Sequence, residues 1–371
     1  MKVNSTLGII FSDAYSDAVS DLTALRTMAS VPFGGRYRFI DFPLSNMVNC
    51  GITKVGVITK SNFQSLMDHI GTGKPWDLSR KTDGLFLLPP FSLKEGVYSG
   101  KMQALTYISN FIRTSREEYV VLYDANIVCS TNLGRMIDEH IASGADMTIA
   151  YREGRIPMLE NVLHLALDAD ERVTKVTVPA KPEKAEGVFG VNILVMKKAL
   201  LERLINEADA ENFTDFERDV IMRNQDRLNI RGWRINDYCA VIDSLQTYYD
   251  ANMDLLKRET RASLFKAKHP VYTKINDDMP SNYGLGSHVT NSVVADGCII
   301  EGTVENCVLF RGVRIGKDAV VRDSIIMQGS IVGEKSKLRS VIIDKHTAIS
   351  AGKELSGDPT YPIYIGKKLV I

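Results

Sequence analysis

Carboxylate side chains follow two apolar segments of this chain, and carboxylates are the groups that proteins use to hold hard cations such as Mg²⁺. Asp13 and Asp17 come after the run Leu7–Phe11, and Asp124 directly follows the run Glu118–Tyr123. One interpretation is that Asp13 and Asp17, with Asp21, form a new site. The other is that these three aspartates are solvated loop residues.

Short apolar runs alternate with helical patterns over the first two thirds of the chain, which predicts an α/β domain with a mainly parallel sheet between helices. Because ligands of such sheets bind beyond the carboxyl ends of the strands, the loops after Phe11 and Tyr123 are where chemistry is expected. Strands are expected at 7–11, 54–59, 118–123 and 146–151, and helices at 41–50, 63–70, 132–143 and 245–258.

The last quarter of the chain repeats every six residues, with glycines between the repeats. The aligned positions are Cys298, Val304 and Phe310; Val313, Ala319, Ile325 and Ile331; and Val320, Ile326, Val332 and Leu338. This period is typical of a parallel β-helix, in which each short strand forms one face of a coil. A β-sandwich with accidental spacing is the alternative. We expect domains at 1–255 and 281–371, joined by a linker at 256–280 that contains two prolines.

Composition excludes several classes of protein. The 371 residues include 45 basic and 45 acidic side chains, so bulk charge indicates no nucleic-acid partner and no anionic membrane surface. No stretch approaches the roughly 20 apolar residues of a membrane span. Five scattered cysteines without a CxxC pair favour neither a disulfide framework nor a zinc site. We therefore expect a cytoplasmic protein.

The segment Phe33–Ile52 (FGGRYRFIDFPLSNMVNCGI) closely resembles a segment of the ADP-glucose pyrophosphorylase (glucose-1-phosphate adenylyltransferase) family. Further matches in chain order are GVIT at 56–59, SLMDHI at 65–70, YSG at 98–100, AKP at 180–182 and YYDANMDL at 248–255. The resemblance covers nearly the whole chain. It implies an α/β nucleotidyltransferase domain of GT-A/Rossmann-like type, followed by a left-handed parallel β-helix of hexapeptide repeats.

The chain departs from this family where the family binds the nucleotide. The family carries a loop GGxGxRLxxLT, in which glycines let the backbone approach a triphosphate and arginines neutralise its charge. The corresponding segment here, Ser12–Val19, has neither glycine nor arginine and contains Asp13 and Asp17. A carboxylate about 4 Å from a phosphate charge costs on the order of 4 kcal/mol at a surface-like dielectric. ATP bound in the family manner is therefore disfavoured.

The family's two metal-binding aspartates are replaced as well. By the resemblance, Ala125 and Val241 occupy their positions, and neither side chain can ligate a cation. Asp124 lies one residue early, so its side chain is expected to turn the other way. Asp243 lies two residues late, and its role stays open. We therefore expect no catalytic residue and no bound metal or other cofactor in this chain.

Some of the family's substrate-binding residues are also replaced in this chain, and others are retained. Met28, Gln103 and Ala180 stand where the family has a lysine, an aspartate and a glutamate. Tyr98, Gly100 and Lys181 match groups that contact glucose 1-phosphate or the nucleotide in active relatives. They define a possible residual sugar-phosphate or nucleotide pocket. Tyr98 as a packing residue and Lys181 as a solvated lysine are the alternatives.

Residues that determine the fold thus match the family, whereas residues that bind the nucleotide and the metal do not. This is the pattern of a GlgD-type non-catalytic subunit. The resemblance implies a subunit of a heterotetramer in glycogen biosynthesis. Its catalytic partner subunit would use Mg²⁺ to make ADP-glucose and pyrophosphate from ATP and glucose 1-phosphate, and a phosphosugar is a possible effector.

Three other hypotheses stay open. They are an active adenylyltransferase with relocated ligands Asp124 and Asp243, a phosphosugar-sensing binding module, and a hexapeptide acyltransferase with a histidine base. For the last, His288 and His346 are the candidates, although we interpret both as surface residues. Asp344, next to Lys345, is interpreted as part of a turn.

Overall fold

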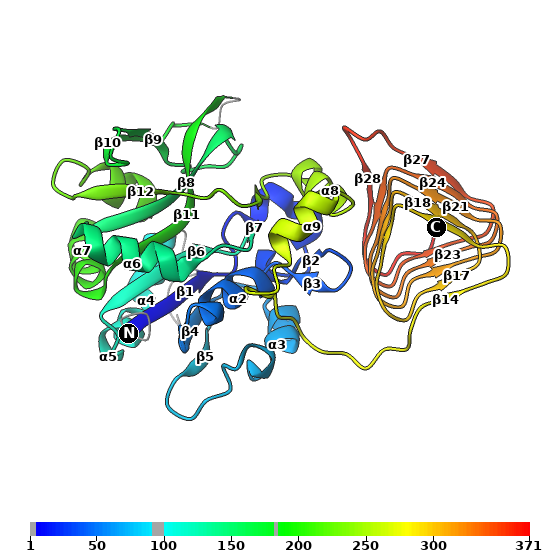
Figure 1. The fold of residues 1–371 in the computed structure, drawn as a ribbon, viewed down its shortest axis with the longest axis horizontal. Coiled ribbons are helices and arrows are strands. Elements are labelled where there is room, and N and C mark those ends of the chain that lie inside the picture. The colour runs from blue at the N-terminus through cyan, green and yellow to red at the C-terminus, as the bar shows by residue number, and fades with distance from the viewer. Residues whose placement is uncertain (1–4, 91–99, 182–184) are drawn as a thin grey trace.

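A mixed nine-stranded sheet lies at the centre of the N-terminal domain in the computed structural model, which describes residues 5–90, 100–181 and 185–371 (Figure 1). Seven strands follow the order β10 (Val173–Thr177), β9 (His164–Leu167), β11 (Glu186–Lys197), β6 (Tyr119–Asp124), β1 (Thr6–Phe11), β4 (Lys54–Ile58) and β5 (Gly84–Leu88). Strand β8 (Met147–Arg155) pairs with β11 and with β12 (Ile230–Arg234).

The prediction of a mainly parallel sheet is met in only one half of this sheet. β1 is parallel to β4 and β6, and β4 is parallel to β5. β11 instead runs antiparallel to both β6 and β8. The reason is local: no described helix separates β8, β9, β10 and β11, and antiparallel neighbours need only short connections, whereas parallel ones need a crossover.

Helices cover both faces of the sheet, as predicted for an α/β domain. Alternate residues of β1 enter different cores, since Leu7 and Ile9 pack on one face and Ile10 on the other. The helices are α1 (Ser20–Thr23), α2 (Asp41–Asn49), α3 (Gln64–Ile70), α4 (Lys101–Tyr107), α5 (Ser109–Thr114), α6 (Leu133–Ser143), α7 (Lys198–Glu211), α8 (Leu245–Asp254) and α9 (Arg258–Leu264). Within the described ranges, none is long and apolar enough to cross a membrane.

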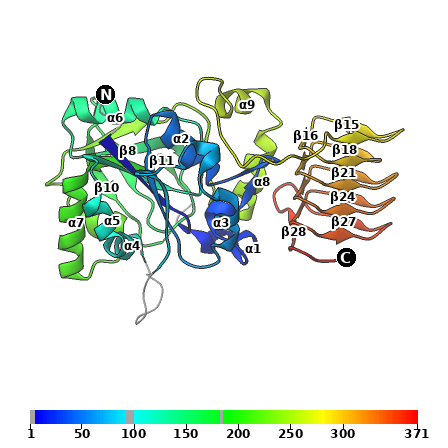
Figure 2. The same cartoon turned by 90° about the horizontal axis from the view of Figure 1, so that it is seen from below.

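The C-terminal domain is the predicted β-helix, in which three parallel sheets stack coil upon coil (Figure 2). The first sheet contains β14 (Asn282–Tyr283), β17 (Ile299–Ile300), β20 (Arg314–Ile315), β23 (Ile331–Val332) and β26 (Ala348–Ile349). The second contains β15 (His288–Thr290), β18 (Thr303–Glu305), β21 (Val320–Arg322), β24 (Lys337–Arg339) and β27 (Glu354–Ser356). The third contains β16 (Val293–Val294), β19 (Val308–Leu309), β22 (Ile325–Ile326), β25 (Val341–Ile343) and β28 (Ile363–Ile365).

The six-residue columns predicted from the sequence are mostly buried, and the coil length explains the exceptions. Strands β18, β21, β24 and β27 pair residues 17 positions apart, one fewer than three complete hexads. A strict six-residue column therefore drifts along the stack and leaves the interior at some positions. Val304 and Leu338 are buried, for example, whereas Ile331 is exposed.

An apolar cluster joins the two domains. Tyr248 of α8 and Leu255, which directly follows that helix, pack with Phe33 from the N-terminal domain. The same cluster contains Phe310 and Met327 from the β-helix.

The segment before the β-helix also packs against the N-terminal domain. Asn49 Nδ2, at the end of α2, donates to Pro270 O at 2.9 Å. The range predicted as a linker, 256–280, thus contains the helix α9 and residues held against α2.

The interface between the domains contains a buried ion pair. The Arg26 guanidinium contacts the Asp344 carboxylate at 2.5 Å, and the side chains are 3% and 2% exposed. Tyr364 also donates to Asp344, at 2.7 Å. Asp344 therefore links the domains, which differs from its interpretation as a turn residue, because its Arg26 partner lies 318 positions away in the sequence.

Candidate functional site

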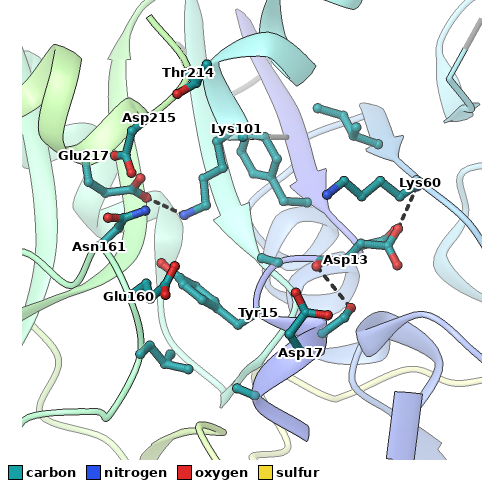
Figure 3. Close-up of a pocket in the computed structure, with 18 of the residues that line it drawn as sticks. Asp13, Tyr15, Asp17, Lys60, Lys101, Glu160, Asn161, Thr214, Asp215 and Glu217 are labelled. Atoms are coloured by element: carbon teal, nitrogen blue, oxygen red, sulfur yellow. Dashed lines mark hydrogen bonds and ion pairs between the residues drawn. The ribbon is translucent and has the colours of Figure 1, made fainter. Parts of the chain in front are cut away.

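A large cavity opens beyond the carboxyl ends of β1 and β4, where the sequence predicted chemistry (Figure 3). Its volume is about 780 Å³. Its walls come from five segments that are distant in sequence, namely 11–18, 58–61, 100–101, 158–161 and 214–217. The position is the one at which parallel sheets of this class bind ligands.

Lys101, at the start of α4, occupies the inner end of this cavity. Its ammonium donates to the Asp124 carboxylate at 2.6 Å and also to the Glu217 carboxylate. Burial acts to lower the pKa of Lys101, but Asp124 and Glu217 together raise it well above its ordinary value. Burial raises the pKa of both carboxyl groups, and Lys101 opposes that effect. The three side chains form one buried ionic cluster, which we call the Lys101 cluster.

Tyr15 covers the Lys101 cluster from the cavity side. The Lys101 nitrogen lies 5.1 Å from the centroid of the Tyr15 ring, within the range of a cation–π contact. Asn192 Nδ2 donates to the Tyr15 hydroxyl at 2.8 Å, and Tyr15 adopts a left-handed backbone conformation with φ +59°. Burial raises the pKa of Tyr15, so the phenol stays protonated near neutral pH.

Asp13 holds the loop after β1 in place. Its carboxylate accepts from the Lys60 backbone N–H at 2.7 Å and from the Ser12 hydroxyl at 2.9 Å. The interpretation of Asp13 as a solvated residue is therefore wrong, since this carboxylate ties the loop to the end of β4. Asp17 lines the same cavity and is exposed, as a solvated loop residue would be.

The two positions of the lost metal ligands provide no donor atoms. Ala125 is buried, and Val241 lies in β13 (Cys239–Val241), which pairs with β7 (Ile127–Cys129). Asp124 is buried, and its carboxylate accepts from the Lys101 ammonium at 2.6 Å. Its carboxylate is engaged by the ammonium, so these residues do not fit a divalent cation.

Asp243 is also engaged elsewhere. It accepts from the Thr247 hydroxyl at the start of α8 at 2.9 Å, and from the Met158 backbone N–H at 2.7 Å. It lines a separate cavity of about 290 Å³, in which neither Asp124 nor Lys101 takes part. Within residues 5–90, 100–181 and 185–371, no three His, Cys, Asp or Glu side chains form a group able to hold a metal.

The possible residual pocket of Tyr98, Gly100 and Lys181 is divided in the structure. Gly100 lines the large cavity, and Tyr98 lies outside the described residues. Lys181 is exposed and borders a separate hollow of about 10 Å³, which has room for no more than about one water molecule. His288 and His346 of the β-helix are both exposed, as interpreted from the sequence.

Sequence reasoning missed a basic cavity between the domains, with a volume of about 150 Å³. Five cationic side chains line it: Arg36, Arg38, Lys274, Arg311 and Lys345. Burial, followed by Arg38 and Arg26, lowers the pKa of Lys345 to about 6. The signal available in the sequence was the pair of arginines in Phe33–Ile52. The other cations come from distant segments.

Comparison with known proteins gives two matched families and several long relatives. Residues 8–158 match the nucleotidyl transferase family, and residues 278–361 match the GlmU-like C-terminal hexapeptide family. A protein named glucose-1-phosphate adenylyltransferase from Clostridium perfringens (strain SM101) is 31% identical over 388 residues, covering 100% of this chain and 98% of the relative. The chain belongs to the glucose-1-phosphate adenylyltransferase family.

Two other similar members of this family carry a different name. The glycogen biosynthesis protein GlgD of Bacillus subtilis (strain 168) is 34% identical over 368 residues, covering 99% of this chain and 97% of that protein. The protein of the same name from Geobacillus stearothermophilus is 37% identical over 327 residues, covering 86% of this chain and 83% of the relative. The family therefore includes proteins named as enzymes and proteins named only for their pathway.

Gly100, which matches the family pattern, has a packing role that can be tested. A Cβ at this position would lie 2.1 Å from the Thr214 carbonyl oxygen. We expect Gly100→Ala to displace that backbone and to lower the free energy of unfolding by about 1–3 kcal/mol. Urea unfolding would measure this loss. Gly187→Ala, whose Cβ would meet nothing closer than 3.5 Å, is the control. Equal effects of the two substitutions would contradict the packing role.

Proposed function

We propose that this chain is a non-catalytic subunit of an ADP-glucose pyrophosphorylase, acting in glycogen biosynthesis in the cytoplasm. It binds a catalytic subunit in a hetero-oligomer, expected to be a tetramer, and raises or regulates the partner's activity. The partner makes ADP-glucose and pyrophosphate from ATP and glucose 1-phosphate with Mg²⁺. Family membership and the two relatives named GlgD support the pathway.

The Lys101 cluster is the observation that carries the non-catalytic assignment. Nucleotidyl transfer requires cationic groups that are available to the phosphates and carboxylates that are available to a divalent ion. Here the single ammonium is held by two carboxylates at the inner end of the cavity, beside the Tyr15 ring, so neither the cation nor the carboxylates are available to a nucleotide or a metal. A triphosphate entering this cavity would meet Asp17, Lys60 and the paired Lys101 cluster rather than a glycine-rich phosphate-binding loop.

An assay of ADP-glucose synthesis tests the proposal. It compares this chain alone, the source organism's own glucose-1-phosphate adenylyltransferase alone, and the two mixed. We expect no turnover by this chain and higher activity in the mixture than in the enzyme alone. Each tenfold activation needs only about 1.4 kcal/mol of preferential binding to the active conformer. Turnover by the isolated chain at ordinary enzymatic rates would refute the assignment and restore the active-enzyme alternative.

The basic cavity supports an anionic effector, which we propose to be a phosphosugar. Among the described residues that line it are five cations and no carboxylate, and Arg311 forms its ion pairs with Asp278 and Asp296 at the long distances of 3.6 and 3.8 Å. The cavity is smaller than the roughly 300–1,000 Å³ that encloses a whole drug-sized ligand. We therefore expect it to receive the phosphate group, with the sugar toward the solvent.

Phosphosugar binding is expected to weaken as pH rises. An anion favours the charged form of Lys345, so binding raises the pKa of Lys345 from about 6 and takes up a proton. Between pH 6 and 8 the affinity should fall, by up to about tenfold per pH unit. Thermal-shift titrations with glucose 1-phosphate and a hexose bisphosphate would measure this, with glucose as the uncharged control.

Two substitutions separate this site from an unspecific charge effect. Arg36 is exposed, so Arg36→Gln should keep the fold and weaken binding at every pH. Lys345→Met should remove most of the pH dependence. Binding that is unchanged in both variants would place the effector elsewhere.

A further inference from the structure

The short antiparallel ribbon β7–β13 places two cysteines directly opposite each other. Cys129 and Cys239 are register partners, although 110 positions separate them in the sequence. Farther along the same ribbon, the Ile242 N–H donates to Asn126 O at 2.9 Å, which identifies residues 126 and 242 as a hydrogen-bonded pair. Because the two kinds of pair alternate, Cys129 and Cys239 form a non-hydrogen-bonded pair.

This position in the ladder suits a disulfide bond. Cα atoms of a non-hydrogen-bonded antiparallel pair lie about 4.5 Å apart, and their side chains approach each other closely. Disulfides span Cα separations of roughly 4.4–6.8 Å. Both cysteines are free thiols in the structure, and each side chain shifts the pKa of the other. Bond formation therefore needs rotation of side chains and no movement of the strands.

The surroundings favour a thiolate at Cys129. The Tyr123 hydroxyl lies 3.1 Å from the Cys129 sulfur, and Asn46 Nδ2 donates to that sulfur at 3.9 Å. The hydrogen bond from Cys239, assisted by the one from Tyr123, lowers the pKa of Cys129. The paired thiols thus share one proton more readily than two isolated buried thiols would.

Cys239 gives the pair access to solvent. Cys129 is buried, but Cys239 is partly exposed and lines the cavity of about 290 Å³ with Arg152 and Asp243. The Arg152 guanidinium donates to the Cys239 carbonyl oxygen at 3.4 Å, so a positive charge stands beside this residue. A small oxidant that enters the cavity reaches Cys239 first.

We propose that Cys129 and Cys239 are a thiol–disulfide modification site, at which a low-molecular-weight disulfide such as glutathione disulfide reversibly crosslinks β7 to β13. This proposal does not depend on the proposed function. It assigns thiol–disulfide exchange to the β7–β13 ribbon, which lies apart from the large cavity that contains the Lys101 cluster.

The exchange proceeds in two balanced steps. The Cys129 thiolate, which the pair favours at rest, accepts the proton of the more accessible Cys239 thiol as the Cys239 sulfur attacks glutathione disulfide and releases one glutathione thiolate. Cys129 then loses its proton and attacks the Cys239 sulfur of the mixed disulfide, which releases the second glutathione. Overall, the two cysteines lose two protons and two electrons, and one glutathione disulfide becomes two glutathione thiols.

The crosslink would restrain the elements that connect the two domains. β7 follows β6, which ends at Asp124, and β13 leads directly to Asp243 and α8. α8 packs against the β-helix through the interdomain cluster. Oxidation is therefore expected to restrict the motion of α8 relative to the rest of the nucleotidyltransferase domain. Closing a loop of this length also restricts the unfolded chain.

The direct test uses the unmodified full-length protein. It is equilibrated in glutathione redox buffers of increasing oxidising strength, alkylated, digested and mapped by mass spectrometry. We expect a Cys129–Cys239 crosslinked peptide, a fall from five free thiols to three, complete reversal by dithiothreitol, and a melting temperature several degrees higher for the oxidised form. Cys239 found only as a glutathione adduct, with Cys129 free, would overturn the proposal.

Matched variants exclude nonspecific oxidation. Cys239→Ser should abolish both the crosslink and the redox-dependent rise in melting temperature. Cys298→Ser is the control, because Cys298 lies in the β-helix and donates to Phe310 O, and this variant should behave like the unmodified protein. Crosslinks that form equally well between other cysteine pairs would also overturn the proposal. The crosslink is mapped in the unmodified protein, so the proposal can be tested even if a cysteine variant folds poorly.

Discussion

Replacing Lys101 with methionine is expected to lower the free energy of unfolding by about 3–5 kcal/mol near pH 8, because two buried carboxylates lose their common cation. Asp124 and Glu217 are 1% and 2% exposed, so water cannot replace the ammonium. Methionine keeps most of the side-chain length, and the effect therefore comes from the charge. Urea unfolding followed by circular dichroism would measure the change.

The same substitution should make stability strongly dependent on pH. In the folded protein the pKa values of Asp124 and Glu217 are raised by burial, and Lys101 opposes this rise. Without Lys101 they rise further, so the folded state binds more protons than the unfolded state at mildly acidic pH. Stability is then present at low pH and is lost as pH rises through these pKa values. The variant should be less impaired at pH 5 than at pH 8.

Lys257→Met is the control for Lys101→Met. Lys257 pairs with Asp254 at 2.6 Å on the surface, and its side chain is 67% exposed. Because exposed ion pairs contribute roughly 0–1 kcal/mol, this variant should lose little stability at any pH. Similar losses for the two lysine substitutions would show that burial of the Lys101 cluster does not matter.

Arg26→Met should have an effect of similar size at the interface between the domains. It leaves the Asp344 carboxylate buried beside Tyr364 without its cation, and breaking a buried pair from one side costs about 3–5 kcal/mol. We expect a lower melting temperature and faster proteolysis of the segment that connects the domains. Differential scanning calorimetry and limited trypsin digestion would measure the two effects.

Neutralising the stranded carboxylate should reverse part of the Arg26→Met effect. The double variant Arg26→Met/Asp344→Asn is expected to be more stable than Arg26→Met alone, because an amide is less costly to bury than a carboxylate. Arg135→Met, which removes an exposed pair with Glu139, should cost less than about 1 kcal/mol. A double variant less stable than Arg26→Met would contradict the electrostatic explanation.

Local patterns predicted most of the elements because those patterns are set by neighbouring residues. Alternating apolar runs identified β1, β4, β6 and the start of β8, and helical spacing identified α2 and α6 within one residue at each end. The hexad columns predicted the β-helix. The strand directions around β11 were predicted wrongly, because parallel neighbours need crossover helices and no described helix lies between β8 and β11.

For the site, the sequence by itself determined what is missing. The absence of glycine and arginine from Ser12–Val19 and the residues Ala125 and Val241 are facts of the chain, and they indicated a site without the family's phosphate and metal groups. Local chemistry sufficed for these inferences, because a methyl group cannot ligate a cation in any fold.

Only the tertiary structure decided what replaced those groups. Asp124 and Glu217 lie 23 and 116 positions from Lys101 in the sequence, and nothing in the spacing pairs them with it. The same is true of Arg26 with Asp344 and of Cys129 with Cys239. Charges and thiols interact over a few ångströms, so their partners are fixed by how distant segments fold together.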